Sequence, residues 1–325
     1  MIRAQMLAPF ITLLWVLLLV GLLLTVVTIA LMAFILLHPP RMTDGRAAWR
    51  LKRLSPGDLR LSYSDVNFKV RDELTGKSIN LAAWWIPHPK ANGRCAILLH
   101  GYGDAKVGAI AWAPTLHAMN FNLLALDLRA HGQSEGRYST AGYFERHDVS
   151  QVIDQLKAQF PDDTREIVLF GISLGAAVAA ATVVLRAEMN DIAAVILECP
   201  FPDYRLAAAS HANIRGAPGP AMQEAAFRLA QKISKADFDA VRPIDLIPRI
   251  PCPLMIIRSD ADVFIDDAHA AMIEEAIKLR PSTPMLSYWN AQNAHHVAAI
   301  CEDPEAYKRR IAAFLDRALL AHGVR

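Results

Sequence analysis

The segment IVLFGISLGAAVAA, residues 167–180, decides how this chain folds. An apolar run typical of a β-strand leads into Gly171-Ile172-Ser173-Leu174-Gly175, and an alanine-rich run typical of a helix follows it. The pattern predicts a tight strand–turn–helix in which only small residues fit beside the serine. Such a turn exposes the Ser173 hydroxyl at the amino end of a helix, where free N–H groups favour negative charge. Ser173 is therefore a candidate nucleophile, although an ordinary strand-to-helix turn has the same pattern.

Short apolar runs alternate with helical patterns on both sides of this segment. The expected strands are 61–70, 78–86, 95–99, 122–126, 166–170, 193–197, 254–257 and 285–288. The expected helices are 107–119, 144–159, 174–187, 221–234, 268–278 and 304–320. The first two strands flank a turn and form an antiparallel pair, and the remaining strands follow one another through helices. The sequence therefore predicts an α/β fold with a mostly parallel, eight-stranded sheet flanked by helices.

The first forty residues form a separate apolar region, for which we expect a transmembrane anchor over 1–40. No charged residue occurs from Ala4 to Leu37, and a helix needs about 20 apolar residues to cross a bilayer. A signal peptide has an apolar core of only about 7–15 residues and a small-residue cleavage site. Here the run is longer and ends in His38-Pro39-Pro40-Arg41, so an uncleaved anchor fits better than a leader or a buried helix.

The charges beside the anchor predict its orientation. Only Arg3 precedes the apolar run, whereas Arg41, Arg46, Arg50, Lys52 and Arg53 follow it. The excess of positive charge after the run places the rest of the chain on the cytoplasmic side of an inner or plasma membrane. We expect residues 41–60 to be a basic juxtamembrane linker, which either contacts anionic headgroups or is simply solvated. The third region, 61–325, is the α/β domain.

The alternation of strands and helices breaks between Cys199 and Pro253. This stretch contains nine prolines and glycines around one helical pattern. We interpret it as a lid insertion, about 200–252, between two strands, and loops of such length are often functional.

A serine hydroxyl needs a base, a carboxylate to orient that base, and donors for the oxyanion. In sheets of this kind these groups lie at the carboxyl ends of strands. Tyr102 follows an early strand in Leu98-Leu99-His100-Gly101-Tyr102-Gly103, and its N–H could form an oxyanion hole together with that of Leu174. Two acids, Asp260 and Asp262, follow a later strand, and two histidines, His295 and His296, follow the last one. The order Ser–Asp–His is that of a hydrolase triad, and the residues alone leave both choices open.

Composition excludes several other classes of protein. The net charge is +2, and no long basic run follows the anchor, which argues against nucleic-acid binding. The four cysteines (Cys95, Cys199, Cys252 and Cys301) have neither zinc spacing nor the spacing of a disulfide framework. The adjacent histidines also lack the spacing of a metal site. We therefore expect no metal and no cofactor.

From about Leu61 to its end, the chain resembles the α/β-hydrolase superfamily in these motifs and their order. The chain is most similar to small membrane-tethered bacterial serine hydrolases of the prolyl-oligopeptidase and serine-aminopeptidase branch. The resemblance is carried by His100-Gly101, by Gly171–Gly175 and by the loop Asp127-Leu128-Arg129-Ala130-His131-Gly132, which has alanine where the family usually has glycine. Arg258-Ser259-Asp260-Ala261-Asp262 departs from the family's H-G-x-x-D but keeps its acid at Asp262.

The resemblance selects Asp262 over Asp260 and His296 over His295, because His296 is followed by a helix start resembling the family's D-P-E-x-Y. It also implies that Asp127, Arg129 and His131 brace the floor of the site. Glu145 and Asp148, which begin a helix, are expected to complement its dipole.

The sequence therefore predicts a membrane-anchored serine hydrolase that cleaves a carboxylic ester or thioester, with an acyl or lipid-like substrate. Ser173 is its nucleophile, His296 its base and Asp262 the residue that orients the base. The alternatives are a peptidase of the same fold and a non-catalytic interaction module that retains it. The acyl length, the oligomeric state and the physiological role do not follow from the sequence.

Overall fold

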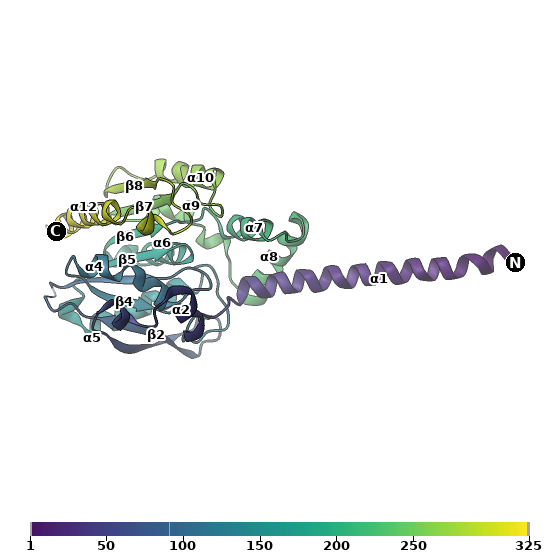
Figure 1. Cartoon of the computed structure of the whole chain (residues 1–325), viewed down its shortest axis with the longest axis horizontal. Helices are drawn as coiled ribbons and strands as arrows, with labels where there is room; N and C mark the ends of the chain where they lie inside the picture. The colour runs from purple at the N-terminus through teal and green to yellow at the C-terminus, as the bar shows by residue number, and fades with distance from the viewer. Residues whose placement is uncertain (1, 91, 324–325) are drawn as a thin grey trace.

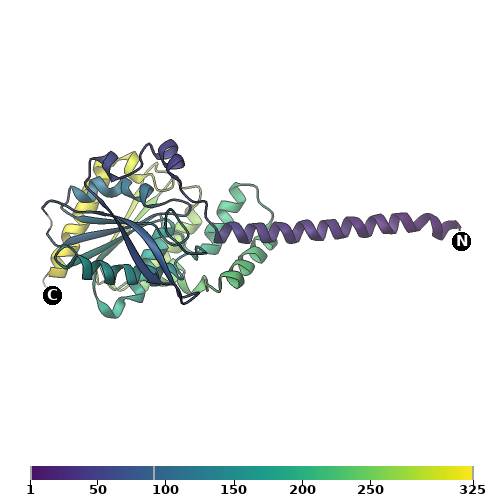
Figure 2. The ribbon, with the colours of Figure 1, turned by 90° about the horizontal axis from the view of Figure 1, so that it is seen from below.

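The computed structural model describes residues 2–90 and 92–323. One long helix, α1 (Ile2–Leu37), projects from an α/β domain, and its carboxyl end contacts that domain (Figure 1). The carboxyl end of the chain lies on the opposite side of the domain from the free end of α1 (Figure 2). The structure thus consists of a long apolar helix and a mixed α/β domain.

The body is built on the predicted sheet of eight strands, whose order is β1-β2-β4-β3-β5-β6-β7-β8. The antiparallel neighbours are β1 with β2 and β2 with β4, and the other neighbours are parallel. The strands are β1 (Ser64–Arg71), β2 (Ser78–Ile86), β3 (Arg94–Leu99), β4 (Asn122–Leu126), β5 (Glu166–Ile172), β6 (Ile192–Glu198), β7 (Leu254–Ser259) and β8 (Leu286–Ala291). Because β3, β5, β6 and β7 are parallel neighbours, their carboxyl ends share one edge of the sheet.

Helices cover both faces of the sheet. They are α2 (Asp44–Leu51), α3 (Lys106–Ala109), α4 (Ala113–His117), α5 (Glu145–Gln159), α6 (Leu174–Leu185), α7 (Tyr204–Ile214), α8 (Pro220–Ser234), α9 (Pro243–Leu246), α10 (Asp267–Lys278), α11 (Ala299–Glu302) and α12 (Pro304–Gly323). Buried side chains of α5, α6, α9 and α10 form one core with the sheet, and those of α3, α4 and α12 form another. The prediction of a sheet flanked by helices is confirmed.

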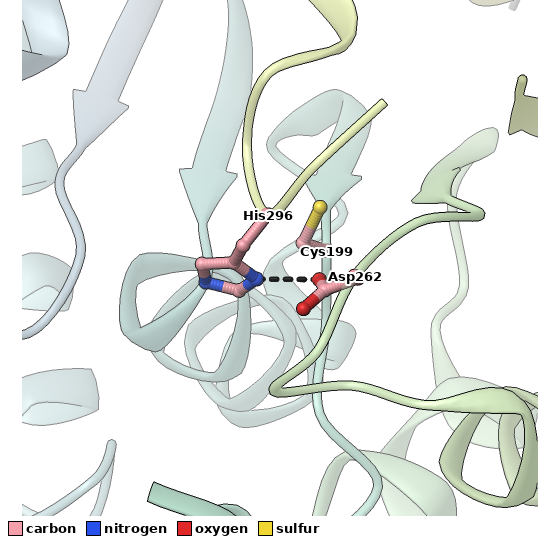
Figure 3. A group of neighbouring side chains, drawn as sticks. All are labelled: Cys199, Asp262 and His296. Atoms are coloured by element: carbon pink, nitrogen blue, oxygen red, sulfur yellow. Dashed lines mark hydrogen bonds and ion pairs between the residues drawn. The ribbon is translucent and has the colours of Figure 1, made fainter. Parts of the chain in front are cut away.

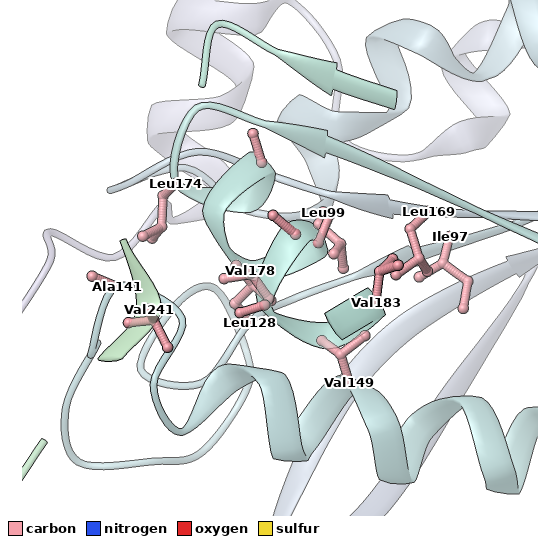
Figure 4. Close-up of a cluster of buried hydrophobic side chains, with 14 of the residues drawn as sticks. Ile97, Leu99, Leu128, Ala141, Val149, Leu169, Leu174, Val178, Val183 and Val241 are labelled. Atoms are coloured by element: carbon pink, nitrogen blue, oxygen red, sulfur yellow. The ribbon is translucent and has the colours of Figure 1, made fainter. Parts of the chain in front are cut away.

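Alternate side chains of a strand belong to the two cores on opposite faces of the sheet. Along β3, Ile97 and Leu99 belong to the core under α5 and α6, whereas Ala96 and Leu98 belong to the core under α12. Figure 4 shows the first of these cores, where Leu174 and Val178 of α6 lie among residues from the strands and from α5. Successive side chains of a strand point to opposite faces, so a strand buried on both sides is apolar throughout. The helix that follows Ser173 is therefore held against the centre of the sheet.

Three regions differ from the expected elements. The helix expected over 107–119 is divided into α3, a 3₁₀ turn (Ile110–Trp112) and α4, and Pro114 lies in the first turn of α4 because proline is excluded from a helix interior. The stretch 41–60 contains α2, and Ala47 of that helix is buried in a core. The insertion contains two helices, α7 and α8, besides the short α9.

A buried ion cluster joins the loop after β4 to α5. Arg129 is 1% exposed; its Nε and Nη2 donate to Asp148 at 2.5 and 2.8 Å, and its Nη1 donates to Asp72 at 2.9 Å. Glu145, also buried, accepts hydrogen bonds from the backbone N–H of Thr140 at 2.6 Å and of Gly142 at 3.1 Å. The two acids that the sequence assigned to the helix dipole therefore also fix the loops packed against α5.

Replacing Arg129 by methionine is expected to lower the free energy of unfolding by about 3–5 kcal/mol, because it leaves Asp148 and Asp72 buried without their cation. The measurement is a urea titration of the full chain in a mild detergent, followed by tryptophan fluorescence. Arg94→Met is the matched control, since Arg94 and Glu166 form a pair at 3.1 Å whose side chains are partly exposed. That control is expected to cost less than about 1 kcal/mol. Equal losses in the two variants would contradict a stabilising role for the buried ion cluster around Arg129.

Candidate active site

Ser173 lies at the sharp turn between β5 and α6. Its backbone has φ 52° and ψ −111°, a conformation that non-glycine residues rarely adopt and that costs about 1–3 kcal/mol. The backbone N–H of Ser173 donates to the carbonyl of Glu198 at 2.9 Å, which ties the turn to the end of β6. The structure therefore holds the serine in a strained position that its surroundings fix.

The glycines on either side of Ser173 are required by close packing. A Cβ atom on Gly171 would lie 2.2 Å from the carbonyl oxygen of Gly175. A Cβ atom on Gly175 would lie 2.0 Å from the carbonyl oxygen of Leu99. Both distances are far below van der Waals contact, so α6 can approach the strands only with glycine at these two positions.

A chain of hydrogen bonds connects Ser173 with His296 and Asp262. His296 Nε2 lies 3.0 Å from Ser173 Oγ, and His296 Nδ1 lies 2.5 Å from Asp262 Oδ2. The other carboxylate oxygen, Oδ1, accepts from the backbone N–H groups of Phe264 at 2.8 Å and Ile265 at 3.0 Å. Figure 3 shows the imidazole of His296 facing the carboxylate of Asp262. The three predicted residues, far apart in the sequence, thus come together at one edge of the sheet.

The structure separates the two neighbouring alternatives from this chain of bonds. His295 is exposed, and its Nδ1 lies 3.2 Å from the carbonyl oxygen of Ala261. The backbone N–H of Asp260 donates to Ala291 at 3.1 Å, on the neighbouring strand β8. The hydrogen bonds from Ser173 therefore run through His296 to Asp262, whereas His295 and the backbone of Asp260 contact Ala261 and Ala291.

The candidate oxyanion donors lie on both sides of Ser173. Leu174 is the first residue of α6, and first-turn N–H groups have no acceptor within their own helix. Tyr102 follows Gly101, whose Cβ position lies 3.6 Å from the Cβ of Ser173. The loop after β3 therefore runs directly beside the serine.

His100, Asp127 and His131 form a buried framework below this loop. His100 Nε2 accepts from the backbone N–H of Leu128 at 3.0 Å, and Asp127 accepts from Lys106 Nζ at 2.8 Å. His131 Nδ1 lies 2.9 Å from the carbonyl oxygen of Arg129. Burial lowers the pKa of His131 to about 3, so this imidazole is neutral. These contacts fit the bracing role that the resemblance implies.

Two residues next to the site, Glu198 and Cys199, are not among the predicted site residues. Glu198 is buried, and its Oε2 accepts from Trp112 Nε1 at 2.9 Å and from the Tyr307 hydroxyl at 2.5 Å. Burial raises the pKa of Glu198 to about 7, so its carboxyl group is partly protonated near neutral pH. The signal in the sequence is a glutamate that directly follows the apolar run 193–197.

Cys199 could complete a metal site with Asp262 and His296, since one ligand atom from each lies within 4.8 Å of the others (Figure 3). However, a metal ligand must be a thiolate, and burial raises the pKa of the Cys199 thiol well above its usual range. The Cys199 Sγ also accepts from the backbone N–H of Val297 at 3.3 Å, next to His296. The donor set therefore fits a thiol that packs behind the histidine better than a metal ligand.

The fold and the arrangement of these residues define an α/β-hydrolase. Residues 90–321 match the family described as serine aminopeptidase, S33, and the chain therefore belongs to this family of the α/β-hydrolase superfamily.

Among relatives, the uncharacterized protein YqkD of Bacillus subtilis is 27% identical over 235 residues, 71% of this chain and 73% of that protein. The α/β-hydrolase domain-containing protein aho-3 of Caenorhabditis elegans is 25% identical over 281 residues, 85% of this chain and 71% of that protein.

Among solved structures, a crystal form of the Pyrococcus furiosus esterase Pf2001 superimposes with a TM-score of 0.68 at 25% identity, and the match covers 87% of this chain and 98% of the esterase. The chain is thus a hydrolase whose similar solved structures include an esterase.

Proposed function

We propose that this chain is a membrane-anchored serine hydrolase that cleaves a carboxylic ester or thioester through an acyl-enzyme. The observation that carries the proposal is the hydrogen-bonded chain from Ser173 through His296 to Asp262. In the proposed reaction Ser173 Oγ attacks the carbonyl carbon while His296 Nε2 takes its proton. His296 then protonates the leaving group, and water, activated by the same imidazole, releases the acid from Ser173.

The remaining groups have supporting roles in this mechanism. Asp262 accepts from Nδ1–H of His296 and stabilises the imidazolium that forms during attack. The backbone N–H groups of Tyr102 and Leu174 bind the oxyanion of the tetrahedral intermediate. Each step uses groups of this chain and water, so the proposed reaction requires no metal and no cofactor.

The aromatic surroundings of His296 favour an acyl substrate over a peptide amino terminus. The ring of Phe264 lies edge-on to His296 at 5.5 Å, and His211 of the lid helix α7 stacks on Phe264 at 4.1 Å. Burial lowers the pKa of His211 to about 4, so this side chain is neutral at physiological pH. An apolar acyl group fits such a wall, whereas a substrate ammonium group would need an acidic partner. The esterase among the solved structures supports the same preference.

The proposal includes membrane anchoring by α1. Pro9–Leu37, 29 residues, is long and apolar enough to cross a membrane by length and composition. At about 1.5 Å per residue these 29 residues reach about 43 Å, more than the roughly 30 Å of a bilayer core. Ala33 and Leu37 are buried in the core of the domain, which supports an anchor that is retained and not removed as a leader. By the distribution of lysine and arginine, the catalytic domain faces the cytoplasm.

The proposed activity is tested with two substrate series and the full chain in detergent. We expect turnover of p-nitrophenyl acyl esters, with little or no release of p-nitroaniline from aminoacyl anilides. The reverse preference would make the chain a peptidase, the second activity that its family supports. Turnover of neither series and no labelling by a fluorophosphonate would contradict a serine hydrolase. A reporter fused to the carboxyl terminus tests the side of the membrane.

A further inference from the structure

The carboxyl end of α1 packs against the catalytic domain along one face. From residue 25 onward the less exposed positions recur every three or four residues, as on one side of a helix. They are Thr25, Thr28, Ile29, Met32, Ala33, Leu36 and Leu37. This face lies against the lid helix α8, and both views show α7 and α8 beside this end of α1 (Figures 1 and 2). The anchor is therefore docked to the domain and does not act as a loose tether.

The last four carbonyl groups of a helix have no partner within it and must find other donors. In α1 all four are satisfied. The carbonyl of Phe34 accepts from the backbone N–H of His38 at 2.9 Å. The carbonyls of the next three residues accept from the Tyr102 hydroxyl, from the Tyr204 hydroxyl at 2.9 Å and from the backbone N–H of Ser139 at 2.9 Å, in that order. Three parts of the domain thus cap this helix, and two of them are the candidate oxyanion loop and the lid.

The chain that follows α1 reinforces this contact. Pro40 packs on Gly103, whose Cβ position would lie 3.2 Å from Pro40 Cγ. Arg41 Nη1 then donates to the carbonyls of Gly132 at 2.8 Å and Ser134 at 2.7 Å, in the loop that braces the site. The end of the anchor and the residues after it therefore hold the oxyanion loop from its outer side.

Tyr102 is the residue where these contacts meet the site. Its neighbour Gly101 lies beside Ser173, its other neighbour Gly103 lies under Pro40, and its hydroxyl is bound to the carbonyl of Ile35. Tyr102 is 37% exposed, and its ring lies edge-on to that of His131 at 6.0 Å, so the hydroxyl contact with α1 adds to a partial packing of this residue. A rotation of this residue would turn its backbone N–H away from the oxyanion, whose stabilisation depends on donor geometry.

We infer that the last turn of α1 supports the oxyanion hole, and that the side chain of Tyr102 is a positioning residue that acts through this turn. The inference rests on the proposed serine hydrolase function. It gives the anchor a second role besides attachment, because the helix that binds the membrane also fixes a donor of the active site. We call the contacts between the last turn of α1 and the domain the junction, and Tyr204 extends this junction to the lid.

The test is Tyr102→Phe in the full chain, assayed in detergent with a short soluble p-nitrophenyl ester. We expect kcat to fall about 3- to 10-fold with KM within about twofold. Loss of the hydroxyl contact would displace the backbone N–H of Tyr102, and this donor binds the substrate only once the oxyanion forms. A trifluoromethyl ketone, which forms an oxyanion on the serine, should bind more weakly by the same factor. Tyr63→Phe is the matched control, because Tyr63 lies against Trp84 at 5.8 Å, away from the junction, and should change neither value.

The outcomes separate this inference from the proposed function. If the wild-type chain hydrolyses the ester and Tyr102→Phe leaves kcat and ketone affinity unchanged, the positioning role is wrong while the hydrolase stands. A rise in KM alone would also overturn it, because it would indicate substrate contact. Inactivity of the wild-type chain would overturn the proposed function itself. If Tyr102→Phe unfolds at a lower urea concentration, Arg41→Met decides by the same readouts, since it removes the hydrogen bonds of Arg41 to His131, Gly132 and Ser134 and leaves Tyr102 intact. A lower kcat and weaker ketone binding would support the inference, and unchanged values would overturn it.

Discussion

Ester hydrolysis by the full chain is expected to fall by about four to six orders of magnitude in Ser173→Ala, and labelling by a fluorophosphonate is expected to disappear. The methyl group of alanine cannot form the acyl-enzyme, so only binding and the oxyanion donors remain to accelerate attack by water. The expected loss is in kcat, with KM little changed, because the serine hydroxyl contributes mainly to the transition state. Initial rates with a short p-nitrophenyl ester and gel fluorescence of the labelled chain measure the two effects.

Ser78→Ala is the control for this experiment, because Ser78 is exposed at the start of β2 and lies outside the candidate site. It is expected to keep both the activity and the label. Alanine at position 173 should be as strained as serine, because neither residue readily adopts the φ of 52° found there. The folded state should therefore keep its urea midpoint. Labelling that persists in Ser173→Ala would identify a different nucleophile.

The strands and the turn at Ser173 could be predicted because local composition determines them. A strand buried on both faces is an apolar run, and β4 begins and ends at the predicted residues 122 and 126. The need for glycine at Gly171 and Gly175 follows from the tight turn that the motif specifies, and the packing distances confirm it. These features depend on residues that are close together in the sequence, so they can be predicted from it.

Helix α8 of the insertion matches the expected helix 221–234, whereas α7 and α2 were not predicted. Asp203 caps α7 by accepting from the backbone N–H of Arg205 at 2.6 Å, and Thr43 caps α2 by accepting from Arg46 at 3.4 Å. Both capping signals are present in the sequence. A capping residue alone does not predict a helix where prolines and glycines surround it, as around α7, or where the helix is as short as α2, which has eight residues and includes Gly45.

The docking of α1 could not be predicted for a different reason. The face that packs on the domain and the face turned away are both mainly apolar, so the sequence shows no alternation of apolar and charged residues that would distinguish them. The donors that cap its last turn are hydroxyl and N–H groups from Tyr102, Tyr204 and Ser139, which are distant in the sequence. Contacts of this kind depend on tertiary structure alone.

The choice between Asp260 and Asp262 also depends on tertiary structure, and it leads to the second large effect. Asp262→Asn is expected to lower kcat by about 10⁴-fold, with the chain still folded. Oδ1 of Asp262 accepts from two backbone N–H groups, those of Phe264 and Ile265. In the variant the amide oxygen takes that position, because an amide NH₂ cannot accept these bonds. The NH₂ group then faces Nδ1 of His296.

This orientation selects the wrong tautomer of His296. Nδ1 must accept from the new amide, so the imidazole proton moves to Nε2, where it prevents Nε2 from taking the proton of Ser173, 3.0 Å away. Hydrolysis of the short p-nitrophenyl ester and urea unfolding of the same preparation measure the loss of kcat and the intact fold. Asp260→Asn is the matched control in the same loop and is expected to retain kcat within a few-fold. A larger loss in Asp260→Asn than in Asp262→Asn would assign the orienting role to Asp260.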